Sequence, residues 1–189
     1  MADTPTLSIC IPTYNRSRFL AELLDSIIAQ GMPEIEVIVS DDASPDDTAE
    51  VAARYADRIA RFTFIRQPQN IGLDRNFLAV IEAASGDYVW LMGDDDRLEP
   101  GGARRVAEAL ARWPGVSGLT VGVIDYDYAM RRSVGVRRMP RTQQMQGVGR
   151  VFGEMADLLG FMSALVVRRE AWMAIAREDS VREFENYYV

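Results

Sequence analysis

Three consecutive aspartates, Asp94, Asp95 and Asp96, follow almost directly on the apolar run at residues 88–92. Five apolar residues in a row predict a strand buried on both faces, so the carboxylates would lie at its carboxyl end. Two carboxylates in contact repel each other by about 4 kcal/mol at an effective dielectric constant of about 20. The cluster is therefore either a solvated acidic turn or a cation site. Carboxylate oxygens suit Mg²⁺ or Mn²⁺, and these ions bridge phosphates.

The composition is that of one folded domain with an acidic balance. Of the 189 residues, 48% are hydrophobic, which suffices for a full core. The net charge is −7 and no stripe of lysine and arginine is present, so nucleic acid is not expected as a partner. The acidic balance also argues against a surface built mainly to hold anionic lipid. A local basic patch would be formed by the clustered arginines Arg131, Arg132, Arg137, Arg138 and Arg141.

Histidine is absent from the sequence, which excludes Ser-His-Asp and Cys-His catalytic arrangements and a histidine-bound zinc site. The lone cysteine, Cys10, lies in an apolar strand pattern and is expected to be a small buried residue. A single cysteine forms no intrachain disulfide, which fits a reducing compartment. The N-terminus lacks the regions of a signal peptide, and no apolar run approaches the ~20 residues needed to cross a bilayer. We expect a soluble cytoplasmic protein.

About the first 115 residues alternate between strand and helix patterns. Apolar runs predict strands at residues 7–12, 35–40, 62–66 and 88–92. Apolar residues at helical spacing, bounded by turn residues, predict helices at residues 19–28, 44–55, 74–85 and 100–113. We expect Ser44 to cap the second helix, with Pro45 at its first position and Asp47 completing a capping box, and Asp74 to cap the third. Four such units in series predict a mostly parallel sheet with right-handed crossovers.

The pattern changes after Gly115. Residues 116–130 and 133–139 favour extended structure, and we expect a long hairpin with the Arg131–Arg132 pair near its turn. A helix ending at Leu159, a strand at 164–167, a helix at 170–176 and a final strand at 184–189 should follow. We therefore divide the chain into residues 1–115 and a smaller mixed part, residues 116–189, and expect the domain to continue past Val189.

Polar side chains follow each of the four predicted strands. They are residues 12–16, the pair Asp41 and Asp42, residues 70–72, and the aspartates at 94–96. Ligands of an open parallel sheet bind at the carboxyl ends of its strands. A nucleoside diphosphate laid across these ends would meet one group from each segment. Tyr14 could stack on its base, an aspartate could accept a base N–H, and a cation held by the acidic cluster could bind the diphosphate.

Each of these groups also has a structural interpretation. Asp46 and Asp47 suit a helix start, where negative charge is favourable. Asn70 and Gly72 are common turn residues, and the two aspartates after the second strand could serve in a turn as well. Arg75 opens a predicted helix and could lie on the surface. Only the combination of the segments, rather than any one of them, favours a binding site.

In order and spacing, these segments resemble the family 2 glycosyltransferases of the GT-A fold, of the bacterial surface-polysaccharide type. The resemblance lies in residues 8–16, 37–44, 70–72 with Arg75 and Asn76, and 86–96, and it covers about residues 6–112. It implies an α/β fold with a Rossmann-like, mostly parallel sheet flanked by helices. Residues 1–115 would form the nucleotide-sugar half, and residues 116–189 the acceptor-side half.

The resemblance implies site residues by position. The nucleotide-sugar pocket would be formed by Pro12, Thr13, Tyr14, Asn15, Asp41, Asp42, Asn70, Gly72, Arg75, Asp94 and Asp95. Asp41 would hydrogen-bond the base. The acidic cluster would be the family's D-x-D motif, although the first aspartate of that motif falls on Gly93 when the strand is aligned. Asp95 would bind Mn²⁺ or Mg²⁺ in either register, together with Asp94 or Asp96, between which the sequence does not choose.

The implied reaction is a metal-dependent displacement at the anomeric carbon with inversion. A carboxylate base would deprotonate the acceptor hydroxyl, and Asp179, Glu183 and Glu185 are the candidates by position. The donor would be a UDP- or dTDP-sugar, and the acceptor a glycan or lipid-linked sugar at the inner face of the membrane, reached by peripheral contact. Two alternatives stay open. One is a nucleotide-sugar-binding module without turnover, and the other is a sugar nucleotidyltransferase, which would normally need a glycine-rich phosphate loop that residues 12–16 do not provide.

Overall fold

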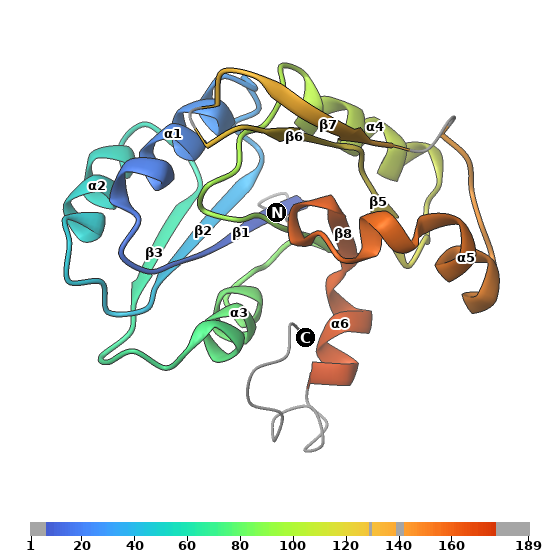
Figure 1. The fold of residues 1–189 in the computed structure, drawn as a ribbon. Coiled ribbons are helices and arrows are strands. Elements are labelled where there is room, and N and C mark those ends of the chain that lie inside the picture. The colour runs from blue at the N-terminus through green and yellow to red at the C-terminus, as the bar shows by residue number, and fades with distance from the viewer. Residues whose placement is uncertain (1–6, 129, 139–141, 177–189) are drawn as a thin grey trace.

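The computed structural model describes residues 7–128, 130–138 and 142–176 (Figure 1). Six strands form its central sheet in the order β3-β2-β1-β4-β8-β5. Their bounds are Phe62–Arg66 for β3, Glu36–Asp41 for β2, Leu7–Thr13 for β1, Tyr88–Leu91 for β4, Leu165–Arg168 for β8 and Gly118–Thr120 for β5. Strands β1 to β4 run parallel, whereas β8 pairs antiparallel with both β4 and β5. The predicted α/β fold with a mostly parallel sheet is confirmed.

Helices cover both faces of this sheet. Their bounds are Ser17–Ile28 for α1, Thr48–Tyr55 for α2, Leu73–Glu82 for α3, Gly102–Arg112 for α4, Val148–Leu159 for α5 and Arg169–Ala176 for α6, with a 3-10 turn, η1, at Met162–Ala164. Figure 1 shows α1 and α2 on the opposite side of the sheet from α3 and α6. None of the helices in the described ranges combines the length and the hydropathy needed to cross a membrane.

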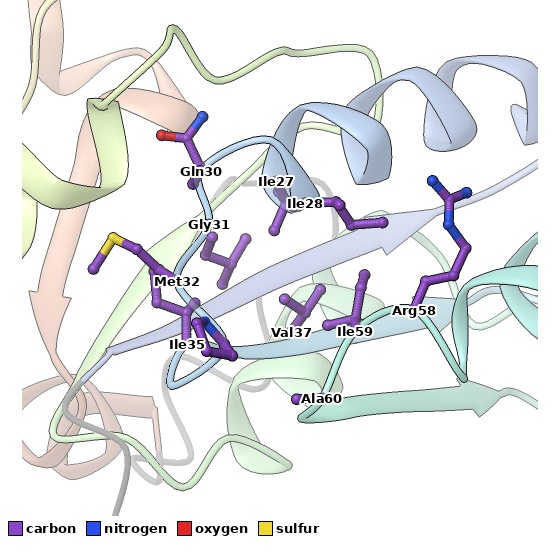
Figure 2. Close-up of a pocket in the computed structure, with 12 residues that line it drawn as sticks. Ile27, Ile28, Gln30, Gly31, Met32, Ile35, Val37, Arg58, Ile59 and Ala60 are labelled. Atoms are coloured by element: carbon purple, nitrogen blue, oxygen red, sulfur yellow. The ribbon is translucent and has the colours of Figure 1, made fainter.

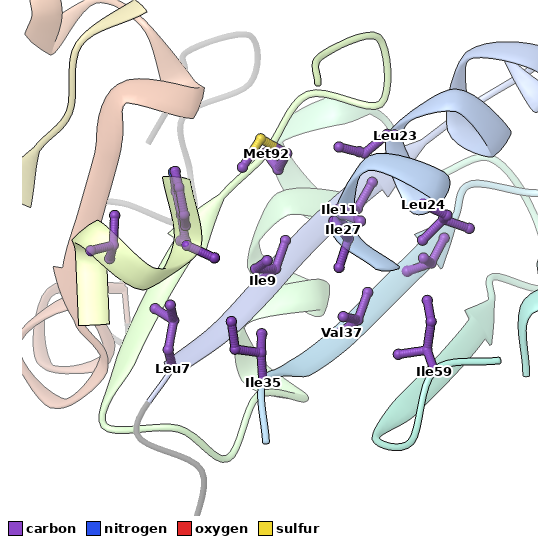
Figure 3. Close-up of a cluster of buried hydrophobic side chains, with 14 of the residues drawn as sticks. Leu7, Ile9, Ile11, Leu23, Leu24, Ile27, Ile35, Val37, Ile59 and Met92 are labelled. Atoms are coloured by element: carbon purple, nitrogen blue, oxygen red, sulfur yellow. The ribbon is translucent and has the colours of Figure 1, made fainter. Parts of the chain in front are cut away.

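Alternate side chains of the central strands enter two apolar cores. On β1, Ile9 and Ile11 belong to the cluster that packs with α1, α2 and α4, whereas Cys10, buried as expected, belongs to the cluster with α3 and α6. On β4, Trp90 enters the first cluster and Val89 the second. Figure 3 shows the first cluster between the sheet and the helices that cover it. Because both faces of these strands are buried, their sequences are continuous apolar runs.

The predicted long hairpin after Gly115 is only partly right. Strands β6 (Val123–Tyr126) and β7 (Ser133–Arg137) do form a separate antiparallel pair. The residues before them instead add β5 to the edge of the main sheet. Glycine permits this close pairing, because a Cβ on Gly118 would lie 2.6 Å from the carbonyl oxygen of Val166. The edge that β5 joins is created by β8, which comes much later in the chain, so the local pattern held no signal for it.

The start of α2 also differs from the prediction. The helix begins at Thr48 and not at Ser44, whose hydroxyl instead accepts a hydrogen bond from the backbone N–H of Asn15 (2.8 Å). Asp46 supplies the hydrogen bonds at this end. Its Oδ1 accepts from the backbone N–H of Thr48 (3.1 Å), and its Oδ2 accepts from that of Ser17, the first residue of α1 (3.0 Å). One carboxylate therefore joins the starts of two helices, in agreement with the structural interpretation of Asp46.

A second carboxylate ties together the amino ends of β1 and β2 and the segment before β4. Glu36 accepts hydrogen bonds from the hydroxyl of Ser8 (2.5 Å) and from the backbone N–H and the hydroxyl of Ser85 (2.8 Å each). Ser8 in turn accepts from the backbone N–H of Gly86 (2.9 Å). Partial burial acts to raise the pKa of Glu36, but the hydrogen bonds outweigh it and leave the pKa below its ordinary value of 4.5.

The substitution Glu36→Gln is expected to destabilise the fold by about 1 kcal/mol at pH 7, below the usual range for bonds to a charged group because the carboxylate is partly exposed. Since the folded pKa is lowered, the charged carboxylate stabilises the protein above pH 4.5, and this contribution is lost as the pH falls through the lowered value. Urea unfolding at pH 7 and at steps below pH 4.5 measures the free energy of unfolding of both proteins. The difference between them should shrink as the pH falls. A difference independent of pH would contradict this role.

Candidate functional site

A cavity of about 480 Å³ lies at the carboxyl ends of β1, β2 and β4. The residues that line it are Pro12, Thr13, Tyr14, Arg16, Asp42, Asn70, Gly72, Leu73, Asn76, Gly93, Asp94, Asp95 and Met162. Each of the four polar segments that follow the predicted strands contributes to this wall. The structure therefore brings these segments together at one edge of the parallel sheet, where ligands of such sheets bind.

Two aspartates of the acidic cluster face this cavity and share one positive partner. Asp94 is nearly buried, and its Oδ2 accepts a hydrogen bond from the hydroxyl of Thr13 (2.8 Å). Nη1 of Arg16 lies 3.4 Å from Oδ1 of Asp94 and 2.6 Å from Oδ2 of Asp95. Burial raises the pKa of Asp94 to about 6; Asp95 adds to the rise, while Thr13 and Arg16 act against it. The pair is a concentrated negative charge beside one cation.

The third aspartate, Asp96, does not line the cavity. Its Oδ2 accepts hydrogen bonds from the backbone N–H of Gly93 (3.1 Å) and from the hydroxyl of Ser163 in η1. Burial raises the pKa of Asp96 as well. A Cβ on Gly93 would lie 2.7 Å from the same oxygen, so the carboxylate of Asp96 takes the space that a side chain at position 93 would need. Asp94, and not Asp96, therefore shares the cavity with Asp95.

Asp94 and Asp95 are the residues of the cavity that could hold a divalent cation. One oxygen from each converges on a single point, which the Arg16 nitrogen takes. Mg²⁺ and Mn²⁺ prefer octahedral oxygen coordination, and such sites often combine one or two carboxylates with water and phosphate oxygens. In the described parts of the chain, no group of three or more His, Cys, Asp or Glu side chains is arranged to hold a metal. Water or phosphate oxygens would thus have to complete the coordination of a cation held by the pair, and Arg16 would have to move.

Asp42 lines the cavity but uses its carboxylate to shape the wall. Its Oδ1 accepts from the backbone N–H of Ile71 (2.7 Å) and its Oδ2 from that of Gly72 (3.0 Å). Gly72 has φ 87°, a conformation that favours glycine, and it precedes α3 as N-cap, whereas the predicted cap Asp74 lies in the first turn. The side-chain oxygen of Asn70 accepts from the same Gly72 N–H (3.1 Å). Asp42 is therefore a positioning residue for this loop.

Asp41 is fully buried and does not line the cavity. Its Oδ1 accepts a hydrogen bond from the backbone N–H of Ser44 (3.0 Å). Its Oδ2 has no hydrogen-bond partner within the described structure and lies 3.6 Å from Nε of Arg66. A buried acceptor without a hydrogen-bond donor is costly, and the ion pair with Arg66 offsets part of this cost.

Of the other residues predicted for the pocket, some line the cavity and some do not. Pro12 and Tyr14 line the cavity, and Tyr14 exposes 47% of its surface, which leaves the ring accessible for stacking. Asn15 adopts a left-handed backbone conformation (φ 57°) and is not among the lining residues. Arg75 is not among them either, although the neighbouring Asn76 is.

The candidate bases Asp179, Glu183 and Glu185 lie outside the described residues. Five lining residues are absent from the predicted pocket, namely Arg16, Leu73, Asn76, Gly93 and Met162. Arg16 stands in the segment 12–16, but its pairing with the acidic cluster joins positions 79 residues apart and has no local signal. Met162 reaches the cavity because η1 leads into the antiparallel strand β8, whose place in the sheet the sequence did not reveal.

A smaller cavity of about 220 Å³ lies at the opposite, amino end of the sheet (Figure 2). Ile27, Ile28, Ile35 and Ile59 contribute to its lining, together with Arg58. None of its lining residues is acidic. Of these two cavities, only the one at the carboxyl end is lined by carboxylates that could bind a cation.

The fold is similar to those of solved glycosyltransferases. The crystal structure of S. aureus TarS 1–349 aligns with a TM-score of 0.72 at 20% identity, covering 90% of this chain and 49% of that one. The mannosyltransferase PcManGT from Pyrobaculum calidifontis, in complex with GDP-Man and Mn²⁺, aligns with a TM-score of 0.65 at 19% identity, covering 92% of this chain and 47% of its own. These likenesses confirm the expected GT-A fold.

Sequence similarity is stronger over a shorter stretch. The abequosyltransferase RfbV of Salmonella typhimurium is 46% identical over 96 residues, 49% of this chain and 28% of the relative. The GalNAc(5)-diNAcBac-PP-undecaprenol beta-1,3-glucosyltransferase of Campylobacter jejuni is 38% identical over 100 residues, 51% of this chain and 32% of the relative. The match thus spans less than a third of the length of these relatives. The family model described as "Glycosyl transferase family 2" matches residues 8–169, and this chain therefore belongs to that family.

Proposed function

We propose that this chain is a metal-dependent inverting glycosyltransferase, which moves a sugar from a nucleoside diphosphate sugar to an acceptor hydroxyl. The observation that carries the proposal is the pair Asp94 and Asp95, whose oxygens converge on one positive group inside the cavity at the carboxyl ends of the parallel strands. Membership of the glycosyl transferase family supports the transfer reaction. Residues 1–115 would bind the donor, and residues 116–189 would face the acceptor.

The base of the nucleotide would lie near Tyr14 and Asp41. Tyr14 offers an accessible ring in the cavity wall, on which a base can stack. Oδ2 of Asp41 has no hydrogen-bond donor among the described residues, and it would accept an N–H of the base once Arg66, its ion-pair partner, moves aside. The loop at residues 70–72, held in shape by Asp42, would border the ribose and the sugar.

The diphosphate would lie at Asp94 and Asp95. These two carboxylates would hold Mn²⁺ or Mg²⁺, which when bound supplies the positive charge that a departing diphosphate requires. The hydrogen bond from Thr13 keeps the carboxylate of Asp94 in one orientation (2.8 Å). Asp96 would brace the turn through its bonds to Gly93 and Ser163 and take no part in binding the cation.

The names of related proteins support a substrate class. S. aureus TarS has been solved in complex with UDP-GlcNAc, and PcManGT with GDP-Man and Mn²⁺. The Campylobacter relative carries a PP-undecaprenol glycan in its name. We infer a UDP- or dTDP-sugar as donor and a glycan, in particular a lipid-linked one, as acceptor. The reaction would then belong to surface polysaccharide assembly at the cytoplasmic face of the membrane.

The acceptor hydroxyl must lose its proton as the sugar is transferred. A carboxylate within hydrogen-bond reach of that hydroxyl is the usual base for such a step. We assign this role to the acceptor-side half of the chain, where Asp179, Glu183 and Glu185 are the candidates. Each of them can be tested by replacement with the matching amide, with turnover as the measurement.

Calorimetric titration of UDP, dTDP, GDP and CDP, each with Mn²⁺ and with EDTA, tests the proposed function. One nucleotide is expected to bind more tightly with Mn²⁺, because the cation links its diphosphate to Asp94 and Asp95. Release of that nucleotide from the matching sugar donor would then establish turnover. Binding that is equal in EDTA would contradict the metal site alone. Failure of all four nucleotides to bind in either condition would contradict the donor-binding function.

A further inference from the structure

Arg16 occupies the point on which the two cavity aspartates converge. It lies in the turn between β1 and α1, and a single nitrogen, Nη1, reaches Oδ2 of Asp95 at 2.6 Å and Oδ1 of Asp94 at 3.4 Å. The Arg16 side chain is 48% exposed, whereas that of Asp94 is only 10% exposed. The guanidinium of Arg16 is therefore less enclosed than the carboxylate of Asp94, and its residue lines the cavity.

A positive partner stabilises the two aspartates when both are charged. Two neighbouring carboxylates repel each other, and Asp94 is largely removed from solvent. The guanidinium of Arg16 supplies this charge without any metal. A divalent cation bound by the same two oxygens would need the position of Nη1. Arg16 and the cation cannot both occupy it, because a direct contact between two cations would replace an attraction with a repulsion.

We propose that Arg16 is a resident counter-cation that competes with the divalent cation for Asp94 and Asp95, and that it leaves them when the cation binds. The inference rests on the proposed function, in which these two residues hold the cation. Arg16 lines the same cavity as the aspartates, so the released guanidinium stays near a phosphate bound there. Guanidinium groups bind phosphate well through paired N–H donors. The exchange would thus make cation binding and diphosphate binding support each other.

The substitution Arg16→Gln, titrated with Mn²⁺ in the absence of nucleotide, tests this competition. The variant is expected to bind Mn²⁺ about tenfold more tightly than the unmodified chain. An effect of this size is expected when two partly exposed ion pairs no longer compete with the metal. Arg18→Gln is the matched control. It removes the same charge two residues away, from an arginine whose side chain is 83% exposed and which pairs with Glu22. Its Mn²⁺ affinity should be unchanged.

The substitution Arg16→Lys adds a second test, because it restores a positive charge at this position. Its Mn²⁺ affinity should return toward that of the unmodified chain. Circular dichroism and thermal melting of each variant show whether it is folded before it is titrated. Equal or weaker Mn²⁺ binding by folded Arg16→Gln, including no binding at all, would overturn the inference. The proposed donor function is judged separately, by whether the unmodified chain binds any of the four nucleotides.

Discussion

The substitution Asp95→Asn is expected to remove the gain in nucleotide affinity that Mn²⁺ provides, a loss of about 100-fold or more. Changing a residue that only supports a metal ligand already weakens metal binding by about 10- to 100-fold, and a direct ligand should count for more. The Asp95 side chain is 51% exposed and pairs with Arg16, so the amide should leave the fold intact. Calorimetry with UDP, dTDP, GDP and CDP in Mn²⁺ and in EDTA measures the effect.

The metal-free titration makes this prediction specific. In EDTA the Asp95→Asn protein should bind the nucleotide no more weakly than the unmodified chain, because the lost oxygen serves the cation. Asp57→Asn is a matched control, since Asp57 is exposed and does not line the cavity. It should preserve both affinities. The same dependence on Mn²⁺ in the Asp95→Asn and unmodified proteins would show that Asp95 does not bind the cation.

The substitution Asn76→Ala is expected to lower the free energy of unfolding by about 2–4 kcal/mol, because it removes two buried hydrogen bonds worth about 1–3 kcal/mol each when one partner is lost. Asn76 is 2% exposed. Its amide donates to the backbone carbonyl of Ser40 (2.8 Å), and its side-chain oxygen accepts from the hydroxyl of Ser40 (2.5 Å). The change leaves polar groups of fully buried Ser40 short of partners. Urea unfolding measures the loss.

The position of Asn76 extends this effect to the cavity. Asn76 joins the first turns of α3 to the end of β2, and α3 follows directly on the loop shaped by Asp42. We therefore expect weaker nucleotide binding as well as lower stability. Gln67→Ala is the control, because Gln67 donates to the same Ser40 hydroxyl (3.1 Å) from a partly exposed position. It should cost less than about 1 kcal/mol. Equal losses of unfolding free energy in Asn76→Ala and Gln67→Ala would contradict the expectation that the buried hydrogen bonds of Asn76 contribute more.

Much of the fold was predictable because its signals are local. The apolar runs that became β1, β2, β3 and β4 lie between helical patterns, and such alternation leads to a parallel sheet by general rules of chain connection. The fold of the residues after Gly115 was harder to predict. The helix ending at Leu159 and the strand and helix after it were found from periodicity. The antiparallel place of β8 and the addition of β5 beside it depend on which strand edge is left open, and no short pattern encodes that.

The site shows the same division. Polar residues next to strand ends could be placed in one cavity from sequence, because the carboxyl ends of parallel strands must meet at one edge. The sequence could not choose between Asp94 and Asp96 as the partner of Asp95. The choice depends on the direction of each side chain in a tight turn, and Ser163, 67 positions away, holds Asp96 out of the cavity. Asp41 was expected at the pocket, yet its carboxylate is fully buried against Ser44 and Arg66.

By itself, the sequence determined the α/β class, the polar segments that follow the four parallel strands and the presence of an acidic motif. These features follow from local periodicity and from short adjacent segments. Only the tertiary structure decided that Arg16 neutralises Asp94 and Asp95, that Asp42 shapes the loop at residues 70–72 and that Met162 completes the wall. These contacts join residues far apart in the chain. They exist only once the packed sheet and helices have fixed where each side chain points.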